Sequence, residues 1–116
     1  MKNKVLNENI LFVTQSIVDE TVKLLQDKIH KIILFGSYAR GDFDSESDID
    51  IMILLNCSEN EVRKYRDDVC KIASRVGLDN DIVVSLVLND KDTFYGRMEV
   101  LKFFQNVKNE GIVLYE

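Results

Sequence analysis

The sequence predicts a two-layer α/β fold of the α+β type, with a mixed sheet of three to four strands packed against helices. Helical stripes of apolar residues alternate along the chain with short apolar runs of strand length. The connection between the first two predicted strands holds only about one helical turn, which is shorter than a parallel crossover needs. With 116 residues, 46% of them hydrophobic, the chain can bury one core. Residues 1–116 are therefore expected to form a single domain.

The first predicted elements are a long amphipathic helix and the buried strand that follows it. Apolar residues recur at helical spacing through residues 9–29, which predicts the helix. The continuous apolar run 32–35 predicts the strand. Residues 37–40 are expected to form a brief helix closed by Gly41, and residues 42–47 a loop. The helical stripe consists of Leu11, Val18, Val22, Leu25 and Ile29.

The second strand and the second long helix carry clear boundary signals. Residues 48–55 alternate acidic and apolar side chains before becoming wholly apolar, which predicts a strand that enters the core. Ser58 and Glu61 have the spacing of a capping box at the start of a helix. Gly77 follows the last apolar residue of this helix and is expected to form its left-handed cap.

The last third of the chain predicts a strand, a helix and a short final strand. Residues 81–88 are rich in valine and isoleucine, which favours a strand. Apolar residues on one face predict a helix over residues 97–109, ended by Gly111. Residues 112–115 can form a short last strand, and an exposed aromatic patch near this helix would be a candidate partner surface.

Composition limits the partners and the location of the protein. The formal net charge of −5 and the absence of an evident basic face argue against a nucleic-acid partner. No apolar run is long enough for a membrane span, so no membrane association is expected. The opening residues 1–9 lead into an amphipathic helix and do not resemble a signal peptide, so the expected location is the cytoplasm.

The sequence "SDID" predicts a metal site at the start of the second strand. Side chains two residues apart on a strand point to the same face, with Cα atoms roughly 6.5–7 Å apart, so Asp48 and Asp50 can bind hard cations together. Magnesium prefers oxygen ligands and takes part of its shell from substrate phosphates. An EF-hand is excluded, because Ser47 and Ile53 stand where that loop needs glycine and glutamate.

The "GSYARG" turn before this loop predicts an anion site. A strand, a glycine and a short helix present backbone N–H groups, and Gly36 lets a ligand approach the backbone closely. Ser37 can donate to a phosphate oxygen, and Arg40 can add a charge-assisted contact. Neither the Walker loop nor the dinucleotide-binding fingerprint is present.

A third carboxylate is predicted at the start of the third strand. If that strand lies beside the second, Asp81 could complete the metal shell or accept a proton from an attacking hydroxyl. Asp79 has the same strand parity and remains the alternative.

These segments resemble the DNA polymerase beta-like nucleotidyltransferase superfamily, whose pattern is Gly-Ser, about ten residues, Asp-x-Asp and a later aspartate. The chain is similar to its minimal members, the MNT antitoxins encoded beside HEPN toxins. The resemblance implies the nucleotidyltransferase fold. It also implies phosphate binding by Gly36 and Ser37, metal binding by Asp48 and Asp50, and the third-carboxylate role for Asp81.

The resemblance further implies a Mg²⁺-dependent enzyme, with two ions, that transfers a nucleotide to a hydroxyl. AMP from ATP would be transferred to a tyrosine of a HEPN-type toxin, and the chain would act as the antitoxin. Two alternatives remain open. An antitoxin could act by occlusion without catalysis, or a homodimer could modify a small molecule of the aminoglycoside type.

Overall fold

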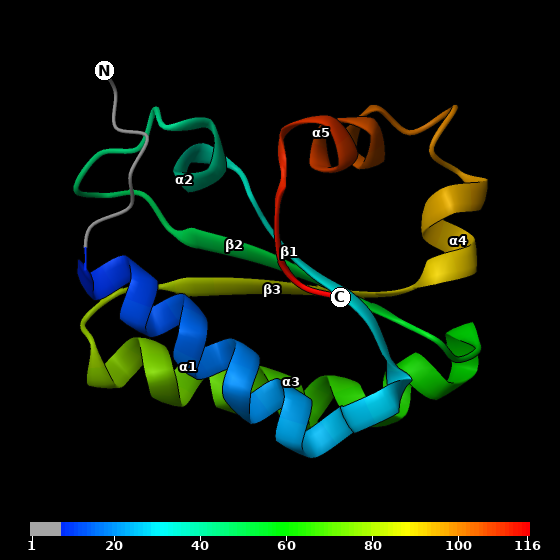
Figure 1. Cartoon of the computed structure of the whole chain (residues 1–116), viewed down its shortest axis with the longest axis horizontal. Helices are drawn as coiled ribbons and strands as arrows, with labels where there is room; N and C mark the ends of the chain where they lie inside the picture. Colours follow the sequence, from blue (N-terminus) through cyan, green and yellow to red (C-terminus); the bar gives the residue numbers. More distant parts are fainter. Residues whose placement is uncertain (1–7) are drawn as a thin grey trace.

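A mixed four-stranded sheet forms the centre of the protein, as the computed structural model, which describes residues 8–116, shows (Figure 1). The strand order is β3-β2-β1-β4. Strand β1 pairs antiparallel with both β2 and β4, and β2 pairs parallel with β3, so the predicted mixed sheet is confirmed. The strands are β1 (Ile29–Phe35), β2 (Ile49–Leu55), β3 (Val84–Asp90) and β4 (Ile112–Tyr115).

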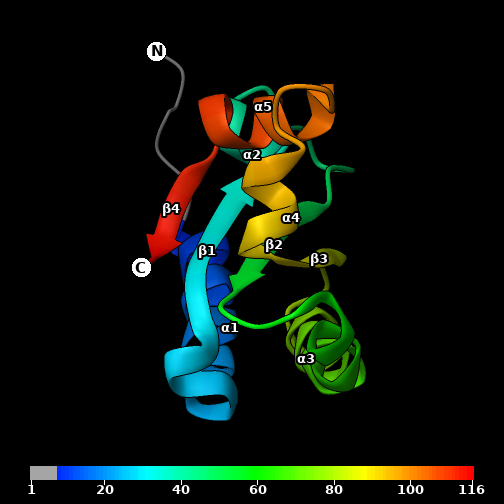
Figure 2. The same cartoon turned by 90° about the vertical axis from the view of Figure 1, so that its right-hand side faces the viewer.

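The two long helices, α1 (Glu8–Leu25) and α3 (Glu59–Asp79), cover one face of the sheet (Figures 1 and 2). A short 3-10 turn, η1 (Gln26–Lys28), links α1 directly to β1. The predicted first helix therefore ends four residues early, and the strand begins at Ile29. The main core lies between this helical layer and the sheet, and its fully buried members include Val13, Ile17, Ile32, Ile51, Ile53 and Val69.

Three short helices, α2 (Ser37–Arg40), α4 (Lys91–Gly96) and α5 (Lys102–Glu110), lie on the opposite face (Figure 2). The helix predicted over residues 97–109 is present as α5, but it begins five residues late, because the chain breaks into turns at residues 97–100 between α4 and α5. This break lets Phe94 and Phe104 pack together, with ring centroids 5.0 Å apart. Together with Ile33, Met52, Leu54 and Val107 they form a second, smaller core.

The two ends of α3 differ in how well the sequence predicted them. Ser58 caps the helix as expected, with its Oγ accepting a hydrogen bond of 3.2 Å from the backbone N–H of Glu61. Gly77 is not a left-handed cap, because the helix continues to Asp79. A Cβ atom at Gly77 would lie 2.5 Å from the carbonyl oxygen of Ile82. The lack of a side chain at Gly77 therefore lets the turn that leads to β3 pass close to helix α3.

The topology brings the end of β1 and the starts of β2 and β3 to the same end of the sheet. Phe35 is the pairing partner of Asp50, and Asp50 is also the partner of Ser85 on β3. The Gly-Ser turn therefore lies beside the first residues of β2. This arrangement follows from one antiparallel and one parallel pairing, which the residue pattern of each strand alone does not specify.

The location of the protein was predicted from its apolar runs and its first residues. Within residues 8–116, no helix has the length and apolar character that a membrane crossing requires. Residues 1–7, on which the prediction about a signal peptide partly rests, lie outside the described residues.

Candidate active site

Gly36 occupies a backbone conformation that other residues avoid. Its φ of 74° and ψ of −155° fall in a region that is essentially restricted to glycine. A Cβ atom here would also collide with the carboxylate of Asp50. The glycine thus permits both the sharp exit from β1 and the contact between the turn and the acidic strand.

Helix α2 follows directly and has the predicted bounds. The carbonyl of Gly36 accepts hydrogen bonds of 3.1 Å from the backbone N–H groups of Ala39 and Arg40. Gly41 closes the helix in the left-handed conformation, with φ of 88°. Because the first N–H groups of a helix have no acceptor within it, this turn is suited to an anion.

The acidic loop contains hydrogen bonds of its own and one aromatic contact to α2. Asp44 Oδ1 accepts a hydrogen bond of 2.8 Å from the backbone N–H of Glu46, and the Ser47 hydroxyl accepts one of 2.9 Å from the backbone N–H of Asp44. Phe43 stacks on the buried ring of Tyr38, with centroids 4.4 Å apart. These contacts hold the loop so that Asp48 arrives beside the start of β2.

Asp50 lies half-buried in a cavity of about 310 Å³ that also contains the Gly-Ser turn. Burial raises the pKa of its carboxyl group, the nearby charge of Asp48 raises it further, and Arg40 opposes both. The environment therefore disfavours the charged form of Asp50, and Arg40 compensates this only in part. The cavity is lined by Phe35, Gly36, Ser37, Arg40, Asp50, Phe103, Asn106, Val107 and Glu110.

Asp48 is exposed and lines a neighbouring groove of about 560 Å³ rather than this cavity. It precedes β2 directly, and it is close enough to Asp50 to influence the pKa of that carboxyl group. The structure thus brings Asp48, Asp50, Gly36, Ser37 and Arg40 to one end of the sheet. Two carboxylates with room beside them fit Mg²⁺, which commonly uses one or two carboxylates together with water and substrate phosphates.

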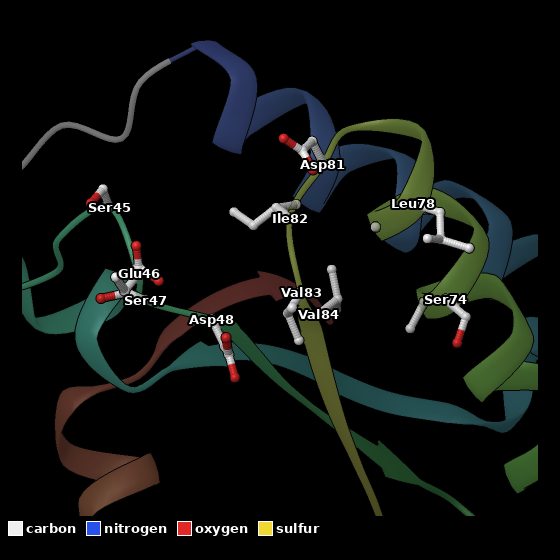
Figure 3. Close-up of a pocket in the computed structure, with 12 residues that line it drawn as sticks. Ser45, Glu46, Ser47, Asp48, Ser74, Leu78, Asp81, Ile82, Val83 and Val84 are labelled. Carbon is white, nitrogen blue, oxygen red and sulfur yellow. The ribbon is translucent and has the colours of Figure 1, made fainter.

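Asp81 does not join this pair. It lies in the turn before β3, which starts at Val84 instead of the predicted residue 81. In Figure 3 its carboxylate points away from that of Asp48. Within residues 8–116, no three acidic, histidine or cysteine side chains are placed to hold a metal ion together. The alternative, Asp79, is the last residue of α3 and is exposed.

The backbone explains why the parity argument failed at this position. Asp81 has φ of 55°, a left-handed conformation in which aspartate and asparagine are enriched. This bend breaks the alternation of side chains on which the prediction depended. On β3 itself, the strand partner of Asp50 is Ser85, which is exposed, and Val83 is 62% exposed.

Arg40 makes ion pairs in the cavity. Its Nε donates to Asp42 Oδ2 at 3.1 Å, and its Nη1 lies 3.6 Å from Glu110 Oε1. Hydrogen bonding to Asp42 is the main cause of a raised pKa of the guanidinium group. To contact a phosphate, Arg40 has to exchange these carboxylates for the ligand.

The comparison with known protein families identifies this arrangement. A family model described as a nucleotidyltransferase domain matches residues 15–113. The chain belongs to this nucleotidyltransferase family. It is 40% identical over 89 residues to Putative protein adenylyltransferase MJ0141 of Methanocaldococcus jannaschii, a match that covers 77% of this chain and 82% of that protein.

Solved structures of nucleotidyltransferase type share the fold. A putative nucleotidyltransferase from Sulfolobus solfataricus matches with a TM-score of 0.64 and 20% identity, over 97% of this chain and 91% of that one. A toxin-antitoxin structure with AMP-PNP matches with a TM-score of 0.54 and 24% identity, over 95% of this chain and 73% of that one. The predicted nucleotidyltransferase fold and enzyme class are confirmed.

The sequence did not predict the wall of the cavity that α5 supplies. Phe103, Asn106 and Glu110 line the cavity that contains the Gly-Ser turn, but they lie far along the chain from that turn. Only the packing of α5 over β1 brings them there. An exposed aromatic patch near the C-terminal helix would be a candidate partner surface, and Phe103 in α5 is 47% exposed.

Glu110→Gln is expected to strengthen nucleotide binding about twofold to fivefold, because it frees Arg40 from one carboxylate and removes a charge that repels phosphate. Titration calorimetry with a nucleotide and Mg²⁺ measures the change. Glu116→Gln is the matched control, since Glu116 pairs with Lys31 at 3.9 Å and does not line the cavity. If Glu110→Gln left the affinity unchanged or weakened it, Glu110 would not compete with the nucleotide for Arg40.

Asp50→Asn is expected to raise the melting temperature of the metal-free protein by about 2–4 °C at neutral pH. The raised pKa means that the folded state disfavours the charged carboxyl group. The folded protein is thus relatively more stable below the unfolded pKa, near pH 4, and loses that stability as the pH rises through the folded pKa. Thermal melts of both proteins between about pH 3 and pH 8 measure the effect. The two melting temperatures should differ most at neutral and alkaline pH and become equal in acid.

Proposed function

We propose that the chain is a Mg²⁺-dependent protein adenylyltransferase that transfers AMP from ATP to a tyrosine of a HEPN-type toxin and thereby acts as its antitoxin. The observation that carries the proposal is the contact between the Gly36 turn and Asp50, with Asp48 beside it. A phosphate site and a carboxylate pair at one end of a sheet are the parts that nucleotidyl transfer needs. The name of the relative MJ0141 and the AMP-PNP in the toxin-antitoxin structure support the choice of adenylyl group and protein acceptor.

Each residue has a separate task in this proposal. The backbone at Gly36 and the hydroxyl of Ser37 bind the triphosphate, and Arg40 adds a charge-assisted contact once its carboxylate partners are displaced. Asp48 and Asp50 would hold Mg²⁺, which when bound supplies positive charge against the phosphate oxygens. Attack of the acceptor oxygen on the α-phosphorus forms the new P–O bond, while the bond to the leaving pyrophosphate breaks and the proton of the hydroxyl passes to solvent water.

Incubation of the chain with ATP, Mg²⁺ and a HEPN-type toxin from the same organism tests the proposal. Intact-mass spectrometry should find the partner heavier by an adenylyl group, and fragmentation should place that group on a tyrosine. The tyrosine-to-phenylalanine variant of the partner and a reaction with chelator are the controls. A partner whose mass stays unchanged with active, nucleotide-bound enzyme contradicts the proposal.

An antitoxin that acts by occlusion is the second candidate, and exposed apolar side chains beside the cavity favour it. Val100 is 78% exposed, Leu101 39% and Phe103 47%, and Phe103 reaches the cavity wall. Such a surface is suited to binding a protein partner. The double variant Asp48→Asn, Asp50→Asn separates the two, because neutralisation of the toxin that survives this change requires occlusion and not transfer.

A further inference from the structure

A groove beside Asp48 remains unexplained by nucleotide binding. Its volume is about 560 Å³, larger than that of the cavity at the Gly-Ser turn. Figure 3 shows the loop that carries Ser45 and Glu46 on one side, the end of α3 with Leu78 on the other, and the start of β3 between them. Asp48 lines this groove, whereas Asp50, Gly36, Ser37 and Arg40 line the cavity. Asp48 therefore lies between the groove and the cavity at the Gly-Ser turn.

This position suits the acceptor. In nucleotidyl transfer the two substrates must meet at the reacting phosphorus. If the phosphates occupy the cavity with Gly36 and Ser37, a hydroxyl from the groove side would reach them next to Asp48. Val83 and Ser85, at the start of β3, are exposed and carry no charge that would repel the phosphates, so the acceptor hydroxyl can approach from this side.

The walls of the groove are apolar and acidic. Leu78 is 83% exposed and Val83 is 62% exposed, which is unusual for two large aliphatic side chains at one hollow. Glu46, Asp48 and Asp81 contribute carboxylates. Within residues 8–116, no lysine, arginine or histidine lines the groove. The complementary ligand is therefore one with basic groups and an apolar side chain.

The groove also favours an extended chain. Its floor includes Val84, the first residue of β3, and β3 is an edge strand of the sheet in the described part of the chain. One side of an edge strand leaves backbone N–H and C=O groups unpaired, and extended peptides bind such edges. The hydroxyl groups of Ser45 and Ser74 add further hydrogen-bonding groups along the walls.

We propose that this groove binds an extended segment of the acceptor protein, with the target hydroxyl residue at Asp48, a neighbouring apolar side chain on Leu78 and Val83, and lysine or arginine residues against Glu46 and Asp81. The inference rests on the proposed function, which it deepens by defining the acceptor. Charge and an apolar contact select the segment, and the nucleotide cavity takes no part in that selection.

Two fluorescent tyrosine peptides of equal length test the inference. One carries a leucine and several lysines around the tyrosine, and in the other glutamates replace the lysines. Fluorescence anisotropy with the whole chain, Mg²⁺ and a non-hydrolysable ATP analogue should find the basic peptide bound about tenfold tighter, with a smaller difference at high salt. Equal affinities, or no binding of either peptide, would overturn the inference.

Variants of the chain locate the binding. The double variant Glu46→Lys, Asp81→Asn should lose most of the preference for the basic peptide, and asparagine tolerates the positive φ at residue 81. The matched control is Asp68→Lys with Asp67→Asn, an equal charge change at two exposed residues of α3 that do not line the groove. Leu78→Ala should weaken both peptides. An equal loss in the control would show a general charge effect and overturn the proposed groove.

The failures of the two proposals can be told apart. Tight, charge-selective peptide binding without AMP transfer to any acceptor contradicts the proposed function and leaves the groove as a binding site. AMP transfer to the partner without any preference for basic peptides contradicts the groove alone. Circular dichroism of each variant ensures that a loss of binding is not a loss of fold.

Discussion

Asp48→Asn and Asp50→Asn are each expected to lower kcat/KM for nucleotidyl transfer by about 10³-fold or more. Asparagine has nearly the same shape as aspartate but lacks the charge that holds a divalent cation. The two residues act as a unit through a shared ligand, so the double variant should lose little beyond the single ones. Rates of AMP transfer at saturating Mg²⁺ measure the effect.

The control for these variants is Asp68→Asn, which removes a carboxylate from an exposed position on α3. It should keep transfer within about twofold of the parent, as surface substitutions away from the site usually do. A calorimetric titration with Mn²⁺ adds a readout that does not depend on turnover, and the Asn variants should bind the ion more weakly. If the double Asn variant lost only about tenfold in activity, Asp48 and Asp50 would not be the residues that hold the metal ion.

Gly36→Ala is expected to destabilise the protein by about 2–4 kcal/mol and to remove most of the transfer activity. The φ and ψ of Gly36 are essentially inaccessible to alanine, and the added methyl group would collide with Asp50. Either the turn or the carboxylate must move, and both belong to the proposed site. Chemical denaturation and a transfer assay measure the two losses.

Gly41→Ala separates backbone strain from the collision. Gly41 also has a positive φ, 88°, but a Cβ atom there would meet nothing within 4 Å. This variant should lose only about 1 kcal/mol and keep nearly full activity at a temperature where it is folded. Equal losses of activity in both glycine variants would mean that contact with Asp50 is unimportant.

Several features were accessible from the sequence because they depend on neighbours along the chain. The short helix at residues 37–40, the Ser58 cap and the last strand at residues 112–115 follow from local hydrogen bonding and turn chemistry, and the structure confirms them. The spacing of Gly36, Asp48 and Asp50 predicted a shared site, and the pairing of Phe35 with Asp50 brings the turn and the strand together.

Tertiary structure alone decided which distant residues surround that site. The bend at Asp81 and the turn before Leu101 are held by local hydrogen bonds to the carbonyls of Gly77, Leu78 and Arg97, and the apolar periodicity of the sequence does not indicate either of them. Glu110 reaches Arg40 only because α5 folds over the end of β1. The sequence by itself determined the turn, the acidic pair and the strand between them, since each is a short-range arrangement. The wall of the cavity that α5 supplies and the groove beside Asp48 form only where separate elements pack together.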